Sequence, residues 1–399
     1  MQRRTFLGSA ILSLAGNAAA TAASSGLALL GALASSAAQA ADVIRIGAMI
    51  PASGPAGLFG PSSRNCCLLA QDDINARGGI LGRKIEVLFG DAGAGPEAAT
   101  QTALKLWKGA GVQAFVGMHD SAVRGALTTM LRGQLPYFYT PTYEGGECSP
   151  GLYINGETPA QQLAPVIPWI SQQRKLKRWY LIGNDYSWPR QTNAVAKSYI
   201  ASSGGSVVGE EYVPFSVDNF DASLAKLRAS DADAVLITLV GGASVSFNRA
   251  FAGLGLAAGI TRLGTLIEEN TLAGIGLQNA DNLYSSAGYF ASLQTQPAKA
   301  FAARYYARFK SADAQLNSLA ESCYEGFLMF EELARRAGKI SVPAFNAVSE
   351  GARYEGPRGT VEMRQRHVVE DILVARAGSS GFEIVKTFPG IGAAQSCKA

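Results

Sequence analysis

The feature of this 399-residue sequence that most constrains its fold is a regular alternation of short apolar runs and amphipathic runs. Runs typical of strands, such as residues 43–50 and 234–238, alternate with runs typical of helices, such as residues 121–131 and 243–256. This alternation predicts βαβ units, in which parallel strands are joined by helices that cover the faces of the sheet. The sequence therefore predicts an α/β fold with parallel-type sheets and right-handed crossovers.

The other predicted elements follow the same alternation along the chain. Further strands are expected at residues 84–89, 113–117, 136–139, 179–183, 206–213, 262–266, 368–376 and 382–388. Further helices are expected at residues 62–76, 96–108, 159–173, 191–203, 222–229, 295–310, 316–337 and 342–348. So many units exceed one ordinary sheet, and the chain is long enough for two lobes that each have a core.

The loop after the strand at residues 136–139 carries a group of side chains suited to binding. Pro141, Gly145 and Gly146 end regular structure there, and the loop holds tyrosines, threonines and Glu144. In an open α/β sheet, ligands bind beyond the carboxyl ends of strands. Aromatic faces, hydroxyls and one carboxylate, without a cation, suit a small and largely neutral polar molecule. The alternative is a tyrosine-rich surface turn.

A second strand-end stretch, residues 181–193, has the same character. Together, the sequences YTPTYEG (Tyr139 to Gly145) and GNDYSWPRQTN (Gly183 to Asn193) resemble the amide- and urea-binding branch of the leucine/isoleucine/valine-type periplasmic binding proteins. The similarity extends in order and spacing over nearly the whole chain after its first 40 residues. It implies the type I fold, with two Rossmann-like lobes joined by a three-strand hinge.

The resemblance also implies a discontinuous division of the chain. Lobe 1 is expected to contain residues 41–158 and 289–358, and lobe 2 residues 159–288 and 359–399. The last crossing between the lobes is expected near residues 354–360. Hinge closure would then bury a small ligand between strand-end loops of both lobes.

In lobe 1, the resemblance places the ligand at the start of the helix at residues 121–131 and at the loop after the strand at residues 136–139. Ser121 is expected to be the N-cap residue, with a hydroxyl and nearby N–H groups that hold a carbonyl or carboxylate oxygen. His119 stands where the related proteins have an aromatic residue, and the family order Pro-Thr-Pro reads Thr-Pro-Thr here. The candidate ligand-binding residues of this lobe are Ser121, His119, Tyr139, Thr140, Pro141, Thr142 and Tyr143.

In lobe 2, Tyr186 and Trp188 match paired aromatic residues that wall the amide pocket. A tryptophan in place of tyrosine removes a hydroxyl and enlarges the face, which favours a bulkier or flatter ligand than acetamide or urea. Glu268 is expected either to accept an N–H group from the ligand or to stand at a helix N-terminus, where acids are favoured. Tyr289, in the return to lobe 1, completes the candidate residues.

The N-terminus has the pattern of an export signal. Arg3 and Arg4 form a twin-arginine pattern, and an Ala/Leu/Ser-rich segment follows that ends in Ala38-Gln39-Ala40. Cleavage is expected after Ala40, with the mature chain in the periplasm. The alternative, a membrane anchor, is disfavoured by the polar residues and glycines that interrupt the apolar run.

Several classes of function are excluded by composition and motifs. The net charge is only +4, without a basic stripe or a reading motif, so a nucleic-acid binder is not expected. With two histidines and five dispersed cysteines, neither a metal site nor a histidine-based catalytic triad is predicted. Cys66, Cys67 and Cys323 are expected to be buried thiols, and no disulfide can be assigned. No P-loop, nucleophile elbow or cofactor motif is found.

The resemblance implies that the chain is a substrate-binding component of an ABC importer, without a cofactor. It would capture a small amide, urea or amino acid and then dock on the membrane permease subunits. One alternative is an amide-responsive sensor of the same fold that binds a protein partner, which the export signal disfavours. The other is an exported redox enzyme, which would need a cofactor motif.

Overall fold

The computed structural model describes residues 43–310 and 314–394, and its strands pair in two parallel groups. Sheet region 1 has the order β2-β1-β3-β4-β5, and sheet region 2 the order β10-β9-β8-β6-β7. Region 1 consists of β1 (Ile44–Ile50), β2 (Ile85–Asp91), β3 (Ala114–Gly117), β4 (Tyr137–Tyr139) and β5 (Leu152–Ile154). Region 2 consists of β6 (Arg178–Asn184), β7 (Ser206–Val213), β8 (Ala234–Thr238), β9 (Thr261–Gly264) and β10 (Leu283–Ala287).

One long strand, β13 (His367–Gly378), joins the two regions. Its first residue, His367, pairs with Ile154 of β5, and the stretch from Leu373 to Arg376 pairs antiparallel with β10. The prediction that the chain crosses near residues 354–360 is wrong, because β11 (Arg353–Gly356) and β12 (Gly359–Arg364) form a hairpin there. The last strand, β14 (Gly381–Ile391), pairs antiparallel with β13.

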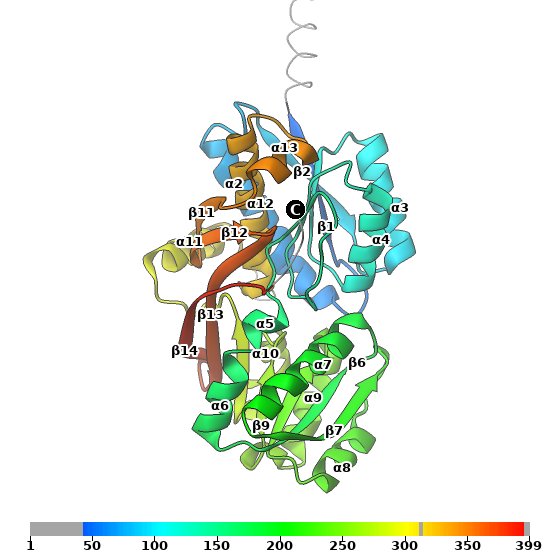
Figure 1. Cartoon of the computed structure of the whole chain (residues 1–399), viewed down its shortest axis with the longest axis vertical. Coiled ribbons are helices and arrows are strands. Elements are labelled where there is room, and N and C mark those ends of the chain that lie inside the picture. Colours follow the sequence, from blue (N-terminus) through cyan, green and yellow to red (C-terminus); the bar gives the residue numbers. More distant parts are fainter. Residues whose placement is uncertain (1–42, 311–313, 395–399) are drawn as a thin grey trace, which may run out of the picture. The chain divides into compact units, whose positions relative to one another are not determined.

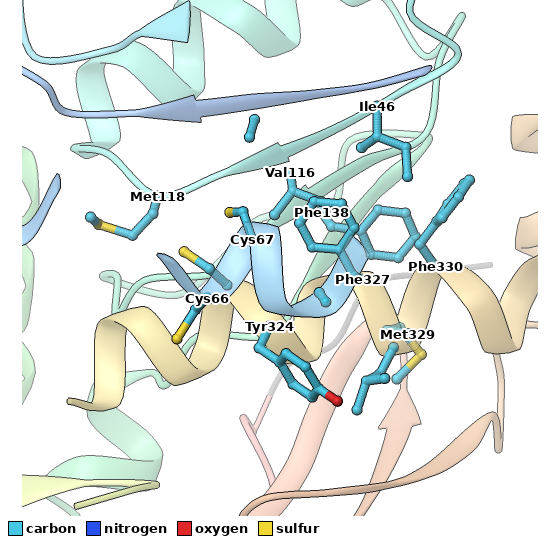
Figure 2. Packing of buried hydrophobic residues seen from close by; sticks show 14 of the residues in the cluster. Ile46, Cys66, Cys67, Val116, Met118, Phe138, Tyr324, Phe327, Met329 and Phe330 are labelled. Atoms are coloured by element: carbon cyan, nitrogen blue, oxygen red, sulfur yellow. The ribbon is translucent and has the colours of Figure 1, made fainter. Parts of the chain in front are cut away.

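Helices cover both faces of region 1. One face carries α2 (Gly60–Ala76) and α12 (Ser318–Ala337), and the other carries α3 (Pro96–Leu104) and α4 (Ser121–Leu131) (Figure 1). In the first of these layers, Cys66 and Cys67 of α2 pack against aromatic residues of α12 and apolar side chains of the sheet (Figure 2). Two further helices, α11 (Gln296–Arg308) and α13 (Val342–Val348), extend this layer.

The faces of region 2 are covered in the same way. One face carries α6 (Val166–Arg174) and α7 (Ser187–Ser202), and the other carries α8 (Asp221–Ala229), α9 (Gly241–Gly253) and α10 (Glu269–Ile275). Because the central strand β8 is covered on both faces, it is almost wholly apolar and every residue of it is buried. The α/β fold class with parallel-type sheets is thus confirmed.

Several predicted helix bounds are wrong for identifiable reasons. The helix expected at residues 159–173 is divided into α5 (Pro159–Gln162) and α6, because Pro165 and Pro168 each lack an N–H group. The helix expected to begin at residue 191 begins at Ser187, since Pro189 lies within the first turn, where its missing N–H costs little.

Other bounds were missed because the segments are short or change helix type. The helix expected at residues 96–108 ends at Leu104 and continues as a π-helical segment, η2 (Lys105–Gly109). The helix expected at 243–256 ends at Gly253 and is followed by a 3-10 turn, η3 (Leu256–Ala258). Strand β5 and helix α10 were not predicted, because runs of three and seven residues carry little periodicity.

The cysteines agree with the expectation for the thiols. Cys66, Cys67 and Cys323 are free and buried. Cys148 is disulfide-bonded, a pairing that was not predicted. No helix among the described residues has the length and apolar character needed to span a bilayer. The expected signal segment, residues 1–40, lies outside the described residues.

Candidate functional site

The N-terminus of α4 opens toward a cavity between the two sheet regions. The sequence predicted Ser121 as its N-cap residue, but the N-cap is Asp120. The Asp120 carboxylate accepts a 2.9 Å hydrogen bond from the N–H of Val123. Ser121 is the first helical residue, and its hydroxyl donates to Glu144 Oε2 at 2.6 Å. The Ser121 hydroxyl is therefore engaged inside the protein. The Asp120 carboxylate already takes N–H groups of Ala122 and Val123 in the first turn. The N–H of Ser121, which has no acceptor within the helix, is left to receive a ligand oxygen.

A buried ion-pair network fixes this helix start against the loop after β4. Arg124 Nη2 lies 2.8 Å from Glu144 Oε1, and Arg124 Nε lies 3.4 Å from Glu147 Oε2. The guanidinium also lies 5.1 Å from the ring centre of Tyr139 and 4.8 Å from that of Tyr143. Because both glutamates neutralise this arginine, it orders the loop and is not free to pair with an anionic ligand.

His119 is satisfied by neighbouring groups and presents no charge. Its Nδ1 lies 3.1 Å from the carbonyl oxygen of Asp120, and its Nε2 lies 2.7 Å from the hydroxyl of Tyr137. A carbonyl only accepts, so Nδ1 carries the proton and Nε2 accepts from the tyrosine. Burial lowers the pKa of His119 to about 4, so the ring is neutral at neutral pH. The hydroxyl of Tyr139 donates to the His119 carbonyl at 2.7 Å.

Sheet region 2 contributes an aromatic wall at the start of α7. The ring centres of Tyr186 and Trp188 are 6.2 Å apart, and those of Tyr186 and Phe215 are 5.0 Å apart. Burial raises the pKa of Tyr186 well above its usual value, so its hydroxyl stays protonated. No hydrogen bond to this hydroxyl is found among the described residues. It can therefore donate to a bound ligand or accept from one.

These groups enclose an inner cavity of about 40 Å³, which adjoins an outer cavity of about 250 Å³. Both are lined by Ala56, His119, Asp120, Tyr186 and Val240. The inner cavity is otherwise lined by Phe59, Met118, Ser121, Tyr139, Pro141, Thr142, Trp188, Leu266 and Leu319. A single water needs about 10–15 Å³ of such space, so the inner cavity suits a group of a few atoms. The outer cavity offers room for a larger body.

A family model described as "Periplasmic binding protein" matches residues 43–381 of the chain. The chain belongs to the periplasmic binding protein family. This binding protein is 24% identical over 358 residues to Leu/Ile/Val-binding protein homolog 6 of Brucella melitensis, covering 86% of this chain and 89% of that protein. It is also 29% identical over 217 residues to Leu/Ile/Val-binding protein homolog 8 of Brucella abortus. This match covers 51% of this chain and 53% of that protein.

Solved structures show the same fold. A solute-binding protein of an ABC transporter from R. palustris, in complex with 4-hydroxybenzoate, has a TM-score of 0.80 at 20% identity; 88% of this binding protein and 99% of that chain are covered. A branched-chain amino acid transporter substrate-binding protein from Streptococcus pneumoniae, in complex with isoleucine, has a TM-score of 0.76 at 21% identity, with 87% and 99% covered. The fold is that of type I periplasmic binding proteins.

Most of the predicted ligand-binding residues of this periplasmic binding protein line the inner cavity. They are His119, Ser121, Tyr139, Pro141, Thr142, Tyr186 and Trp188. The hydroxyl of Thr142 is within hydrogen-bond distance of the Glu157 carbonyl and of Gln162 Oε1, so the residue presents its apolar part to the cavity.

Two loop residues predicted to bind ligand lie outside both cavities. The hydroxyl of Thr140 lies 3.3 Å from the carbonyl of Gly117 and 3.6 Å from the sulfur of Cys323. The hydroxyl of Tyr143 is hydrogen-bonded to Nε2 of His367 at the start of β13. Both residues therefore hold the loop in place and do not line the cavities.

The two remaining predicted residues are also engaged elsewhere. Glu268 is the N-cap of α10, and its carboxylate accepts hydrogen bonds from the N–H groups of Asn270 and Thr271 at 2.8 and 2.7 Å. Of the two alternatives for Glu268, the structure favours the helix cap. Tyr289 is fully buried, and its ring packs edge-on against Phe301 in the core of region 1.

Some lining residues were missed by reasoning from the sequence. Val240 and Leu266 each follow the end of a strand by two residues, as the predicted loops do, but they are apolar and carried no chemical signal. Phe59 and Leu319 likewise come from segments that look like ordinary core. The rule that ligands bind beyond strand ends identifies the first two positions when it is applied to every strand.

Proposed function

We propose that this binding protein is the substrate-binding component of an ABC importer and captures a small solute in the periplasm. The observation that carries the proposal is that the cavity is lined from both sheet regions by the predicted residues. A ligand there would be enclosed by α4 on one side and by the start of α7 on the other. Its binding would favour the arrangement in which the two regions are in contact. That arrangement would dock on the membrane permease subunits.

The polar groups of the site favour a ligand with an oxygen-bearing end and no cationic group. The first turn of α4 offers the N–H of Ser121 to a carbonyl or carboxylate oxygen, since Asp120 takes those of Ala122 and Val123. Tyr186 offers a hydroxyl, and the rings of Tyr139, Tyr186 and Trp188 offer flat apolar surface. Glu268 is engaged as the cap of α10. Asp120, whose carboxylate is the other one at the cavities, is engaged as the cap of α4, so neither is offered to an ammonium group. We therefore favour amides, ureas and aromatic acids over zwitterionic amino acids.

A thermal-shift screen tests this proposal. The compounds compared are acetamide, urea, 4-hydroxybenzoate and isoleucine. The last two are included because they are the ligands in two solved structures of similar fold. A ligand present at 100 times its Kd adds about 2.7 kcal/mol to the free energy of unfolding. We expect at least one of the first three to raise Tm and isoleucine not to. A rise with isoleucine alone contradicts the proposed ligand class, and no rise with any small solute contradicts the proposed function.

A further inference from the structure

The three segments that connect the sheet regions meet at one buried cluster of charges. Glu157 follows β5, Gly288 follows β10, and Glu370 lies on β13 between the residues that pair with β5 and with β10. The N–H of Gly288 donates to Glu157 Oε1 at 2.6 Å. A Cβ on Gly288 would lie 2.5 Å from Arg358 Nη1 and 2.6 Å from Glu370 Oε2. Only glycine therefore lets the three segments come together here.

Arg358, in the turn between β11 and β12, is the centre of this cluster. Its Nη1 is paired with Glu370 and lies 3.8 Å from Glu157. Its Nη2 lies 3.1 Å from Glu321, and its Nε lies 2.8 Å from Glu325, both on α12. The arginine side chain is 2% exposed, and those of Glu321, Glu325 and Glu370 are 0% exposed. We call these five residues, Arg358, Glu157, Glu321, Glu325 and Glu370, the hinge cluster.

One guanidinium cannot neutralise four carboxylates in a buried site. With every glutamate ionised, the cluster would carry an excess of three negative charges where desolvation is costly. Glu321 Oε2 lies within ion-pair distance of Arg358, but neither carboxylate oxygen of Glu321 accepts a well-directed hydrogen bond from the described residues. Burial raises the pKa of Glu321 and of Glu370 well above the usual range, against the opposing effect of Arg358. The cluster therefore retains protons at pH values where exposed glutamates are ionised.

We propose that the hinge cluster is a proton-binding hinge: the protein holds protons there while the two sheet regions are in contact, and separation of the regions releases them. The contact includes a 3.3 Å hydrogen bond from Asn270 of α10 to Ser62 of α2. Any rotation of one region against the other displaces the connecting segments, and with them Glu157 and Glu370. Displacement admits water, which returns Glu321 and Glu370 to their ordinary, ionised state.

The sign of the pH dependence follows from this proton balance. The contacting arrangement binds more protons than the separated one, so falling pH favours contact and rising pH favours separation. The groups that face Glu370 are Arg358, Glu157 and Glu325. Those that face Glu321 are Arg358, Glu325, Glu370, the phenols of Tyr289 and Tyr354, and the thiol of Cys66 on α2. The hydroxyl of Tyr354 donates to Glu325 at 2.6 Å. Arg358 stays charged throughout the accessible pH range, so Glu321 and Glu370 carry the change.

The test uses the mature chain without ligand. Small-angle X-ray scattering is recorded from about pH 5 to about pH 9, on either side of the expected titration. We expect the radius of gyration of the wild type to rise with pH. We expect Glu370→Gln to reduce this rise and Glu321→Gln/Glu370→Gln to abolish it, because glutamine is a permanently neutral isostere. Glu362→Gln, which changes an exposed ion pair on β12, should behave as the wild type.

Infrared spectroscopy detects protonated carboxyl groups directly. Its signal would not change if the glutamates of the cluster served only to hold the fold together. A protonated carboxyl group has its own carbonyl band, and we expect the neutral-pH band of the wild type to lose intensity in Glu370→Gln and in Glu321→Gln. Either single variant suffices if the other fails to fold. An unchanged band together with a pH-independent radius of gyration overturns the proposal. The inference rests on the proposed closure around a ligand, but neither measurement needs a ligand, so a failed ligand screen leaves this test readable.

Discussion

The hydroxyl oxygen of Ser121 lies 2.6 Å from Oε2 of Glu144, and this hydrogen bond ties the first turn of α4 to the loop after β4. Arg124 pairs with the other oxygen of the same carboxylate at 2.8 Å. The wall of the cavity on this side is therefore held together from within. A ligand would meet a prearranged helix start with the N–H of Ser121 open to it, and the position of this turn depends on the network.

Replacing Ser121 with alanine should therefore affect stability more than binding. The substitution leaves the buried Glu144 and Arg124 with one partner fewer, which costs about 1–3 kcal/mol of unfolding free energy. Ligand affinity should change little, since the backbone N–H group remains. Urea unfolding measures the first effect, and Ser198→Ala, on the exposed side of α7, is the matched control. A variant with full stability but no binding would show that the hydroxyl itself contacts the ligand.

Replacing Tyr186 with phenylalanine should have the opposite effect. Its hydroxyl has no hydrogen bond within the described residues, so stability should be unchanged. Loss of one ligand hydrogen bond, worth about 0.5–1.5 kcal/mol, should weaken affinity by up to about tenfold. Calorimetric titration measures this, with Tyr199→Phe, on α7 but away from the cavity, as control. Equal affinities would mean that the hydroxyl does not reach the ligand.

Acid should destabilise the protein through His119. Burial lowers the pKa of this residue to about 4, against about 6.5 in an unfolded chain, so below about pH 6.5 the unfolded state binds more protons. Stability contributed by the neutral ring is present above about pH 6.5 and is lost as pH falls toward 4, by about 3 kcal/mol. Urea unfolding at several pH values should show a shallower slope for His119→Gln than for the wild type. An identical slope would mean that the ring is protonated in the folded protein.

Alkali should destabilise the protein through Glu269. Burial, followed by the neighbouring charge of Glu268, raises the pKa of this carboxyl group to about 8. The folded state thus binds more protons, and stability is lost as pH rises from the unfolded value toward 8, by up to about 5 kcal/mol. Glu269→Gln should gain stability over the wild type as pH rises, while Glu97→Gln, on the exposed first turn of α3, should not. Parallel unfolding curves at every pH would contradict this prediction.

The limits of prediction from the sequence are visible in particular residues. The helix at Ser121–Leu131 and the strands at Ser206–Val213 and Ala234–Thr238 were predicted with the bounds that the structure has, because their periodicity is strong. The cap of α4 was misassigned, since Asp120 and Ser121 are adjacent residues that both favour capping.

Roles that depend on distant partners could not be read from the sequence. Tyr143 was expected in the pocket, but its hydroxyl is bonded to His367, 224 residues away in the chain. Arg358 was not singled out at all, because its four glutamate partners are spread from residue 157 to residue 370. The position of a residue at a strand end can be predicted from the sequence, but the direction and partner of its side chain cannot.

Calorimetric titration of the wild type and of Tyr186→Ala with the strongest ligand of the screen tests the central claim most directly. The claim is that this ligand is held between the first turn of α4 and the aromatic wall of α7. We expect the alanine variant, which loses both the ring and the hydroxyl, to lose at least about 2 kcal/mol of binding free energy, or roughly 30-fold in Kd, while Tyr199→Ala retains wild-type affinity. An unchanged Kd in a folded Tyr186→Ala variant would contradict the claim and place the binding site elsewhere in the protein.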